Sequence, residues 1–237
     1  MIGLGTIINT GGIVAGGVFG RFFGRFLKER HQETLNMACG ISVLFLGTAG
    51  AMEHMLEITE EGLAGTGTFL VVLSLVLGGL VGEIINIEGW FERFGEWLKV
   101  KTGNARDLQF VDGFVTASLT VCIGAMAIVG AIEDGITGNW AILGVKTILD
   151  FIIIIVMTCS LGKGCAFSAI PVFLLEGGVT VLATFIKPIL TDAAMNNLSL
   201  VGSILIFCVG LNLVWGKKVR VANLLPAILF AVIAAYF

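Results

Sequence analysis

The sequence predicts an all-α polytopic membrane protein, with residues 1–237 forming a single integral membrane domain. Three observations predict this class: long apolar runs, lysine and arginine gathered on alternate loops, and tryptophans near the ends of the runs. Hydrophobic residues make up 57% of the chain and charged residues 13%, and the mean hydropathy is +1.00. This composition excludes a soluble protein and leaves no room for a sizeable soluble domain beside the membrane spans.

Eight apolar runs have about the length that a helix needs to cross a bilayer. In chain order they cover residues 2–23, 34–55, 68–87, 110–132, 140–160, 166–186, 198–215 and 221–237. The first run lacks the basic start and the small-residue cleavage pattern of a signal peptide, so we expect it to remain as a span. The sixth run contains Pro171, Gly177 and Gly178, which loosen a helix, so we expect this span to be broken or re-entrant.

The positions of lysine and arginine give the expected orientation in the membrane. Of the fourteen such residues, all but Lys146 and Lys187 lie at the end of, or after, the first, third, fifth or seventh run. Eight crossings place those loops on one side, which the positive-inside rule identifies as cytoplasmic, and both termini are then external. The four tryptophans lie at or just beyond the ends of runs, as in an interfacial aromatic belt: Trp90, Trp97, Trp140 and Trp215.

A short amphipathic helix is expected over residues 88–100, between the third and fourth runs. Aromatic and apolar residues recur there at helical spacing, interleaved with charged ones: Trp90, Phe91, Phe94, Trp97 and Leu98. A helix of this kind lies in the plane of the membrane surface, here on the cytoplasmic face. It serves either as an anchor only or as a regulatory element.

Glycines recur every four residues along the first run, at Gly12, Gly16, Gly20 and Gly24. This spacing places them on one helix face, where another helix backbone can approach closely. The approaching helix belongs either to the same chain or to a second copy, in which case the protein is a homo-oligomer.

Similar patterns indicate internal repeats. The segment from Gly11 resembles the segment from Gly78, so that runs one and two recur as runs three and four. The segment from Gly177, followed by run seven, repeats the pattern again, but these runs cross the membrane in the opposite direction. An inverted repeat is typical of secondary transporters, whose binding sites lie near the membrane midplane at the repeat interface.

Two carboxylates fall near the middle of runs, Asp150 in the fifth and Glu176 in the sixth. A charge at this depth costs from about 3 to more than 10 kcal/mol unless it is paired, protonated or hydrated, so each acid is a candidate for handling ions, protons or solutes. Lys146 lies one helical turn before Asp150 and shares its helix face. The two form either a structural ion pair or a cation site in which Lys146 competes with the incoming cation.

Further candidate ligands precede the first glycine pair of the first run: Thr6, Asn9 and Thr10. By the proposed repeat, they correspond to the segment around Glu176. Within the membrane we count four acids against the single base Lys146, which favours a cationic or proton-coupled solute: Glu83, Asp112, Asp150 and Glu176. Of these acids, Glu83 and Asp112 lie nearer the cytoplasmic ends of their runs, where we expect them to be interfacial.

No metal site, cofactor or enzymatic centre is expected. The five cysteines lie mostly in apolar runs, without the Cys or Cys/His spacing of a zinc site. No serine elbow, HExxH or paired aspartate motif is present in the sequence, so we expect no enzyme. The expected partners are the lipid bilayer and a small solute or ion, and not a nucleic acid.

Four segments stand out together: GTIIN from Gly5, CIGAMAIVGAIEDG from Cys122, KTILD from Lys146 and FSAIPVFLLEGG from Phe167. They resemble the YdfK/YqgA-like family of small bacterial inner-membrane proteins, and the resemblance covers essentially the whole chain. It implies a multi-pass protein of the bacterial plasma membrane with seven or eight helices, and no established substrate or reaction. The motif positions that it implies are Thr6, Asn9, Gly124, Asp134, Lys146, Asp150, Ser168 and Glu176.

The sequence leaves two functions open. The first is a transporter or channel for a small solute, cationic or coupled to protons or cations, with Asp150, Glu176 and the segment around Asn9 lining a mid-membrane site. The alternative is a membrane scaffold or sensor that transports nothing, in which Lys146 and Asp150 form a structural pair. A water-accessible cavity facing both acids would favour transport, and a dry core would favour the structural role.

Overall fold

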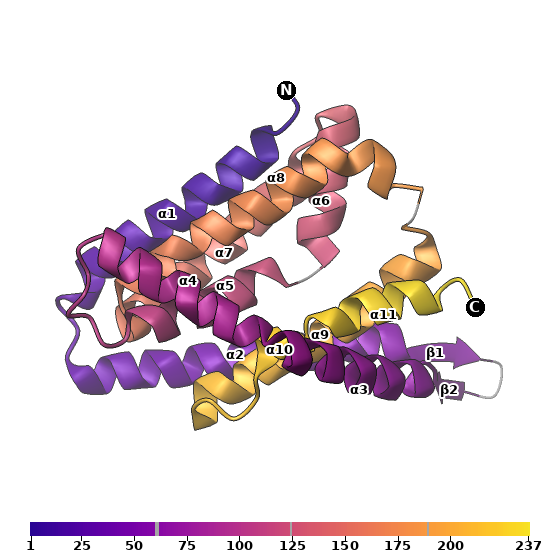
Figure 1. Cartoon of the computed structure of the whole chain (residues 1–237), viewed down its shortest axis with the longest axis horizontal. Coiled ribbons are helices and arrows are strands. Elements are labelled where there is room, and N and C mark those ends of the chain that lie inside the picture. Colours follow the sequence, from indigo (N-terminus) through magenta and orange to yellow (C-terminus); the bar gives the residue numbers. More distant parts are fainter. Residues whose placement is uncertain (60–61, 124, 189) are drawn as a thin grey trace.

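The computed structural model describes residues 1–59, 62–123, 125–188 and 190–237, and it shows a bundle of helices with one short hairpin (Figure 1). In chain order the elements are α1 (Leu4–Gly24), α2 (Glu29–Met55), β1 (Leu56–Thr59), β2 (Gly62–Gly65), α3 (Thr68–Ile85), α4 (Ile87–Lys101), α5 (Phe110–Cys122), α6 (Ala125–Thr137), α7 (Ala141–Leu161), the 3-10 helix η1 (Lys163–Ser168), α8 (Ala169–Ile186), α9 (Asp192–Trp215), α10 (Val221–Leu224) and α11 (Pro226–Ala234). Each of the eight apolar runs is therefore largely helical.

Five segments of the described chain are long and apolar enough to cross a membrane: Arg30–Met55, Thr68–Ile85, Ala141–Leu161, Lys163–Ile186 and Asp192–Trp215. The helices Phe110–Cys122 and Met126–Thr137, bent by 63° at a short break, make a sixth if they count as one span. These six match the predicted runs two to seven, so the structure is that of an all-α membrane protein. The first run forms α1, which glycine and polar residues make less apolar, and the last forms only a short apolar helical segment. The count of eight spans and the internal repeats stay predictions.

The break in a span falls at a different place from the expected one. The sixth run is helical without interruption over Lys163–Ile186, as η1 leading into α8, so the expected break there was wrong. Pro171 lies in the first turn of α8, where a proline is tolerated because few N–H groups have helical partners there. The break lies instead after Cys122, between α5 and α6.

The helices pack in two groups, which meet through α5 and through the contact of α2 with α7. In one group α1 packs along α7, and α8 contacts α6 and α1 (Figure 1). In the other, α2 packs along α9, and α11 contacts α3 and α9. Between them α5 contacts η1, α7, α8 and α9, and it buries Phe110 and Phe114 completely. This arrangement places α1, α7 and α8 together, with the carboxyl end of α5 beside α7.

The glycine stripe of α1 lies against α7 of the same chain. A Cβ atom at Gly16 would lie 2.8 Å from the carbonyl oxygen of Phe151, and one at Gly20 would lie 2.6 Å from that of Ile155. There is no room for a side chain at such a distance from a backbone, so the stripe sets the close approach of α1 to α7. All four glycines face α7 in this way: Gly12, Gly16, Gly20 and Gly24.

The loops predicted to be cytoplasmic meet in two places. The end of α1 and the segment after α7 share one cavity, to which they contribute Arg21, Arg25 and Lys163. The junction of α3 and α4 and the segment after α9 share another, to which they contribute Glu83, Glu92, Lys217, Lys218 and Arg220. The basic loops after alternate runs are therefore neighbours in space, as a common side requires. Which side of the membrane they occupy stays a prediction.

The predicted amphipathic helix is α4, which extends one residue beyond the expected range of 88–100 at each end. Its apolar residues divide between two faces. Leu98 is buried and Phe91 packs against the core, whereas Trp90 and Trp97 are exposed. Exposed indole rings on a surface helix suit a membrane interface, but the cytoplasmic position of α4 stays a prediction.

The loop between α2 and α3 contains a hairpin that no apolar run predicts. Strands β1 and β2 pair antiparallel, with Leu56 opposite Gly65 and Thr59 opposite Gly62. Gly62 has a φ of +121°, which only glycine adopts without strain. The hairpin adds a small sheet to an otherwise helical protein.

We expect a Cβ at Gly20 to destabilise the protein and a Cβ at Gly11 to leave it intact. Gly20→Ala forces the backbones of α1 and α7 apart and should cost about 1–3 kcal/mol of unfolding free energy. At Gly11 a Cβ would meet no atom within 4 Å, so Gly11→Ala gains about 0.5–1 kcal/mol of helix propensity. Thermal unfolding of both variants in detergent micelles measures the difference. Equal stabilities would contradict the close packing of α1 on α7.

Candidate functional site

The two mid-run acids and the lysine form one buried cluster, which we call the charge cluster: Lys146, Asp150 and Glu176. Lys146 and Asp150 lie on successive turns of α7 and form an ion pair. The Lys146 Nζ atom also lies 3.6 Å from Oε1 of Glu176 on α8. The three residues are 6%, 5% and 1% exposed, in that order. Charges enclosed in this way interact strongly, because little water screens them.

The break after α5 supplies a further partner for the lysine. Lys146 Nζ donates a hydrogen bond to the carbonyl oxygen of Val121, at 2.8 Å. Val121 lies in the last turn of α5, where carbonyl groups lack helical donors and carry the negative end of the helix dipole. The broken helix therefore aims freed backbone oxygen at the buried ammonium group.

Asn9 joins the charge cluster from α1. Its Nδ2 atom donates to Oε1 of Glu176 at 2.8 Å, and the residue is fully buried. The amide oxygen of Asn9, Oδ1, and the second carboxylate oxygen of Glu176, Oε2, are buried with no hydrogen-bond donor among the described residues. A buried acceptor without a donor costs about 1–3 kcal/mol, and more when it carries charge. The charge cluster thus contains two oxygens that a proton or a cation would satisfy.

The formal charges of the cluster do not balance. Two carboxylates face one ammonium group, and the ion pairs of the described residues bring no second base to them. With all three groups ionised, one negative charge remains inside the bundle. Such a charge is strongly unfavourable at membrane depth, so the arrangement favours uptake of one positive charge.

A line of buried polar groups extends from the charge cluster toward the amino-terminal end of α1. Thr6 and Thr180 lie one turn from Asn9 and Glu176, and their Oγ1 atoms are 3.2 Å apart. Beyond them, Oδ2 of Asp134 on α6 accepts a hydrogen bond from the backbone N–H of Gly5, at 2.9 Å. A carboxylate at this position also stabilises the positive end of the α1 dipole. Asp134 is fully buried, and no described group donates to its Oδ1 atom.

The candidate residues predicted from the sequence divide into those in the charge cluster and those outside it. Asn9 contacts Glu176 directly, and Thr6 lies one turn further along α1. Thr10 donates to the backbone carbonyl of Thr6 within its own helix, and Ser168 donates to that of Cys165. Neither hydroxyl has a described contact with the cluster. The motif residue Gly124 lies outside the described residues.

Residue-by-residue reasoning on the sequence missed two partners. Thr180 lies four residues after Glu176, so the helical spacing could have indicated it. The carbonyl of Val121 becomes available only because α5 ends nearby, which no residue type encodes. Asp134 had been indicated only by the family resemblance.

The charge cluster is enclosed. Its three residues are at most 6% exposed, and none of them lines any of four cavities, of about 230 to 630 Å³, that open elsewhere among the described residues. In the described part of the chain, no group of three or more His, Cys, Asp or Glu side chains could hold a metal ion. The burial of the cluster favours a structural role, whereas its charge imbalance favours a ligand.

These features define a polytopic α-helical membrane protein with an enclosed ionic cluster between its helices. Comparison with known families identifies the group: the chain belongs to the family described as protein of unknown function (DUF554), which matches residues 4–236. The resemblance drawn from the sequence motifs is thereby confirmed.

Two relatives match almost the whole chain. The "Uncharacterized membrane protein YdfK" of Bacillus subtilis (strain 168) is 32% identical over 225 residues, covering 95% of this chain and 92% of the relative. The "Uncharacterized protein YqgA" of Escherichia coli (strain K12) is 28% identical over 239 residues, covering 96% of this chain and 94% of the relative. No solved structure matches the chain.

Removing the lysine should destabilise the protein more than removing the lysine and its partner together. Lys146→Met leaves two carboxylates without an ammonium group and should cost about 3–5 kcal/mol of unfolding free energy. Adding Asp150→Asn removes one of those charges and should recover part of the loss. Thermal unfolding of the two single variants and the double variant forms a double-mutant cycle. Additive losses would contradict a direct coupling of the two residues.

Proposed function

We propose that the protein carries protons or a small cation across the membrane, and that the charge cluster is its mid-membrane site. The observation that carries this proposal is the unbalanced negative charge beside the two oxygens without donors, Glu176 Oε2 and Asn9 Oδ1. A purely structural ion pair needs one acid and one base. The second acid adds an electrostatic penalty that a transported positive charge would remove.

Lys146 would act as the competitor of the transported cation. Its ammonium group has two kinds of partner, the two carboxylates and the carbonyl oxygen of Val121. When a cation approaches Asp150 and Glu176, the ammonium can keep its bond to Val121 and release the carboxylates. The cation and the ammonium group together then balance the two carboxylates, so the occupied cluster has no net charge.

Access to the site would require movement of helices, because the charge cluster is enclosed. The line through Thr6, Thr180 and Asp134 offers polar groups toward the amino-terminal end of α1. The break after α5 provides a place where the two halves of a span can change their angle. The structure would then correspond to an occluded state of an alternating-access cycle.

The setting we propose is the bacterial plasma membrane, crossed several times, with both termini external. The partners are the lipid bilayer and the transported ion or solute, with no cofactor, nucleic acid or enzymatic reaction. The stripe of glycines is covered by α7, so a homo-oligomer would use another surface.

Reconstitution into liposomes tests the transport function. We expect the wild-type protein to dissipate an imposed gradient of protons, Na⁺ or K⁺, followed with an internal fluorescent indicator. Asp150→Asn and Glu176→Gln keep the shape of each side chain but remove its charge, and each should slow the flux by about tenfold or more. Unchanged flux in both variants would exclude these residues as the site.

Glu96→Gln provides the matched control. Glu96 is an exposed acid on α4 whose described ion pair is with the neighbouring Lys99, at 3.7 Å. Its neutralisation should leave the flux unchanged, so a general effect of removing one negative charge can be separated from the effect at the charge cluster.

The enclosure of the charge cluster supports a second candidate, a membrane scaffold or sensor without transport. In that case Lys146 and Asp150 only hold α7 in place, and exchanging them should preserve the protein's role in the cell. The variant combining Lys146→Asp with Asp150→Lys tests this. A folded double variant that has lost its cellular role would favour the ligand site, and wild-type liposomes without flux would favour the scaffold.

A further inference from the structure

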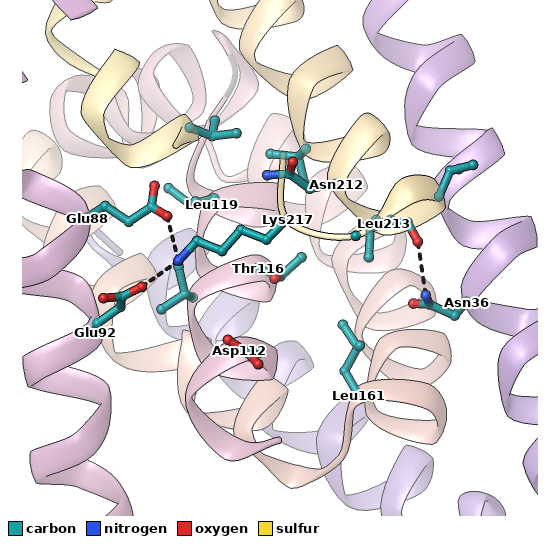
Figure 2. A pocket seen from close by; sticks show the side chains of 15 residues that line it. Asn36, Glu88, Glu92, Asp112, Thr116, Leu119, Leu161, Asn212, Leu213 and Lys217 are labelled. Atoms are coloured by element: carbon teal, nitrogen blue, oxygen red, sulfur yellow. Dashed lines mark hydrogen bonds and ion pairs between the residues drawn. The ribbon is translucent and has the colours of Figure 1, made fainter. Parts of the chain in front are cut away.

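A second acidic site lies away from the charge cluster, at the end of the bundle predicted to be cytoplasmic. A cavity of about 470 Å³ opens between α2, α4, α5 and the carboxyl end of α9 (Figure 2). Its polar wall includes Glu88 and Glu92 of α4 and Asp112 of α5. The remaining wall is largely apolar and includes Leu119 and Leu213. The cavity therefore combines carboxylates with a hydrophobic surface, as sites for small organic ligands do.

A lysine of the protein already occupies two of these carboxylates. Figure 2 shows the Lys217 side chain reaching across the cavity to Glu88 and Glu92. Its Nζ atom is 2.8 Å from Oε1 of Glu88, and it also pairs with Glu92. Asp112 has no ion pair among the described residues. Three carboxylates thus face one ammonium group, and the cavity is negative overall.

Two buried oxygens in the cavity wall lack donors. Glu88 is 4% exposed, and its Oε2 atom has no hydrogen-bond partner in the described chain. On the opposite wall, Asn36 donates to the carbonyl of Leu213 at 3.1 Å, while its Oδ1 atom is buried without a donor. Buried acceptors of this kind are stabilised by a donor that enters the cavity. The Asn36 oxygen is separate from the three acids, and it points to a ligand that donates hydrogen bonds.

The Lys217 side chain is exposed enough to leave the cavity. Its side chain is 51% exposed, and it follows Gly216 in the short segment between α9 and α10. Asn212 fixes this segment, because its Oδ1 atom accepts from the backbone N–H groups of Lys218 and Val219. Asn212 holds the backbone of this segment and not the Lys217 side chain, so the side chain can swing out while the backbone stays in place.

Lys217 stays charged in this environment. Partial burial lowers its pKa, but hydrogen bonds and attraction from Glu88 and Glu92 outweigh burial and hold the pKa above its ordinary value. The contribution of these ion pairs to stability is therefore complete below pH 10.5, the ordinary value for lysine, and is lost only as the pH rises through the raised pKa. At neutral pH the cavity is occupied by an alkylammonium group that belongs to the protein.

We infer that the cavity binds a small organic cation with a primary ammonium group on a short alkyl chain, and that Lys217 occupies the same carboxylates until the ligand displaces it. The lysine side chain is itself a butylammonium group, so the structure displays the chemistry that the carboxylates accept. A bare metal ion fits poorly, since no group of three or more described His, Cys, Asp or Glu side chains could hold one and much of the wall is apolar. This inference does not depend on transport through the charge cluster.

Binding of butylamine to the purified protein in lipid nanodiscs, measured by isothermal titration calorimetry, tests the inference. Butanol serves as the neutral ligand of the same shape, and Mg²⁺ as an inorganic cation. We expect butylamine to bind and butanol and Mg²⁺ not to bind. Lys217→Gln removes the internal competitor, so it should tighten butylamine binding by about tenfold. Lys218→Gln removes the neighbouring exposed lysine, whose side chain does not line this cavity, and should leave binding unchanged.

Glu92→Gln keeps the inference testable if Lys217→Gln does not fold. Glu92 is partly exposed, and losing its charge should weaken butylamine binding by about tenfold. Equal affinities of the Lys217→Gln, Lys218→Gln and wild-type proteins would overturn the inference, as would equal binding of butanol and butylamine. The assay needs no flux, so its outcome is distinct from that of the liposome experiment.

Discussion

The charge cluster is the physical constraint on which the rest of the structure depends. Three ionisable side chains enclosed between helices are tolerated only where partners surround them closely. The close approach of α1 to α7, set by the glycine stripe, brings Asn9 within hydrogen-bonding distance of Glu176. The end of α5 adds the carbonyl of Val121. Helix packing and helix breakage therefore both serve the same buried charges.

The protein uses one arrangement twice. In the charge cluster Lys146 bridges Asp150 and Glu176, and in the second cavity Lys217 bridges Glu88 and Glu92. In each case one carboxylate keeps a buried oxygen without a donor, and the acids outnumber the base. We propose that a lysine in such a place acts as a tethered cation that partly neutralises the acids while no ligand is present. The two sites differ in access, since the first is enclosed and the second is open.

Local patterns in the sequence predicted the helical class, the amphipathic helix and the main members of the charge cluster. Lys146 and Asp150 could be paired from helical spacing alone, and Glu176 stood out because no lipid-facing position suits it. Only the proposed internal repeat related Asn9 to Glu176 in the sequence. These predictions depend on composition and periodicity, which a single sequence contains.

What the sequence did not predict depends on contacts between distant segments. Pro171 and the glycine pair indicated a broken sixth span, yet the break is after Cys122, where no proline marks it. The second cavity joins α2, α4, α5 and α9, and its residues carry no common motif. The residues that line it range from Asn36 to Val221, about three quarters of the chain, so only the packing of the helices brings them together.

The central claim is that the charge cluster takes up one positive charge. Infrared spectroscopy of the reconstituted protein, recorded as pH and cation concentration are varied, observes its carboxyl groups directly. We expect a carboxyl band that responds to these changes in the wild type and is absent from the spectrum of Glu176→Gln. If Glu176→Gln removes no band that responds to pH, Na⁺ or K⁺, the cluster binds neither protons nor these cations, and the account is contradicted.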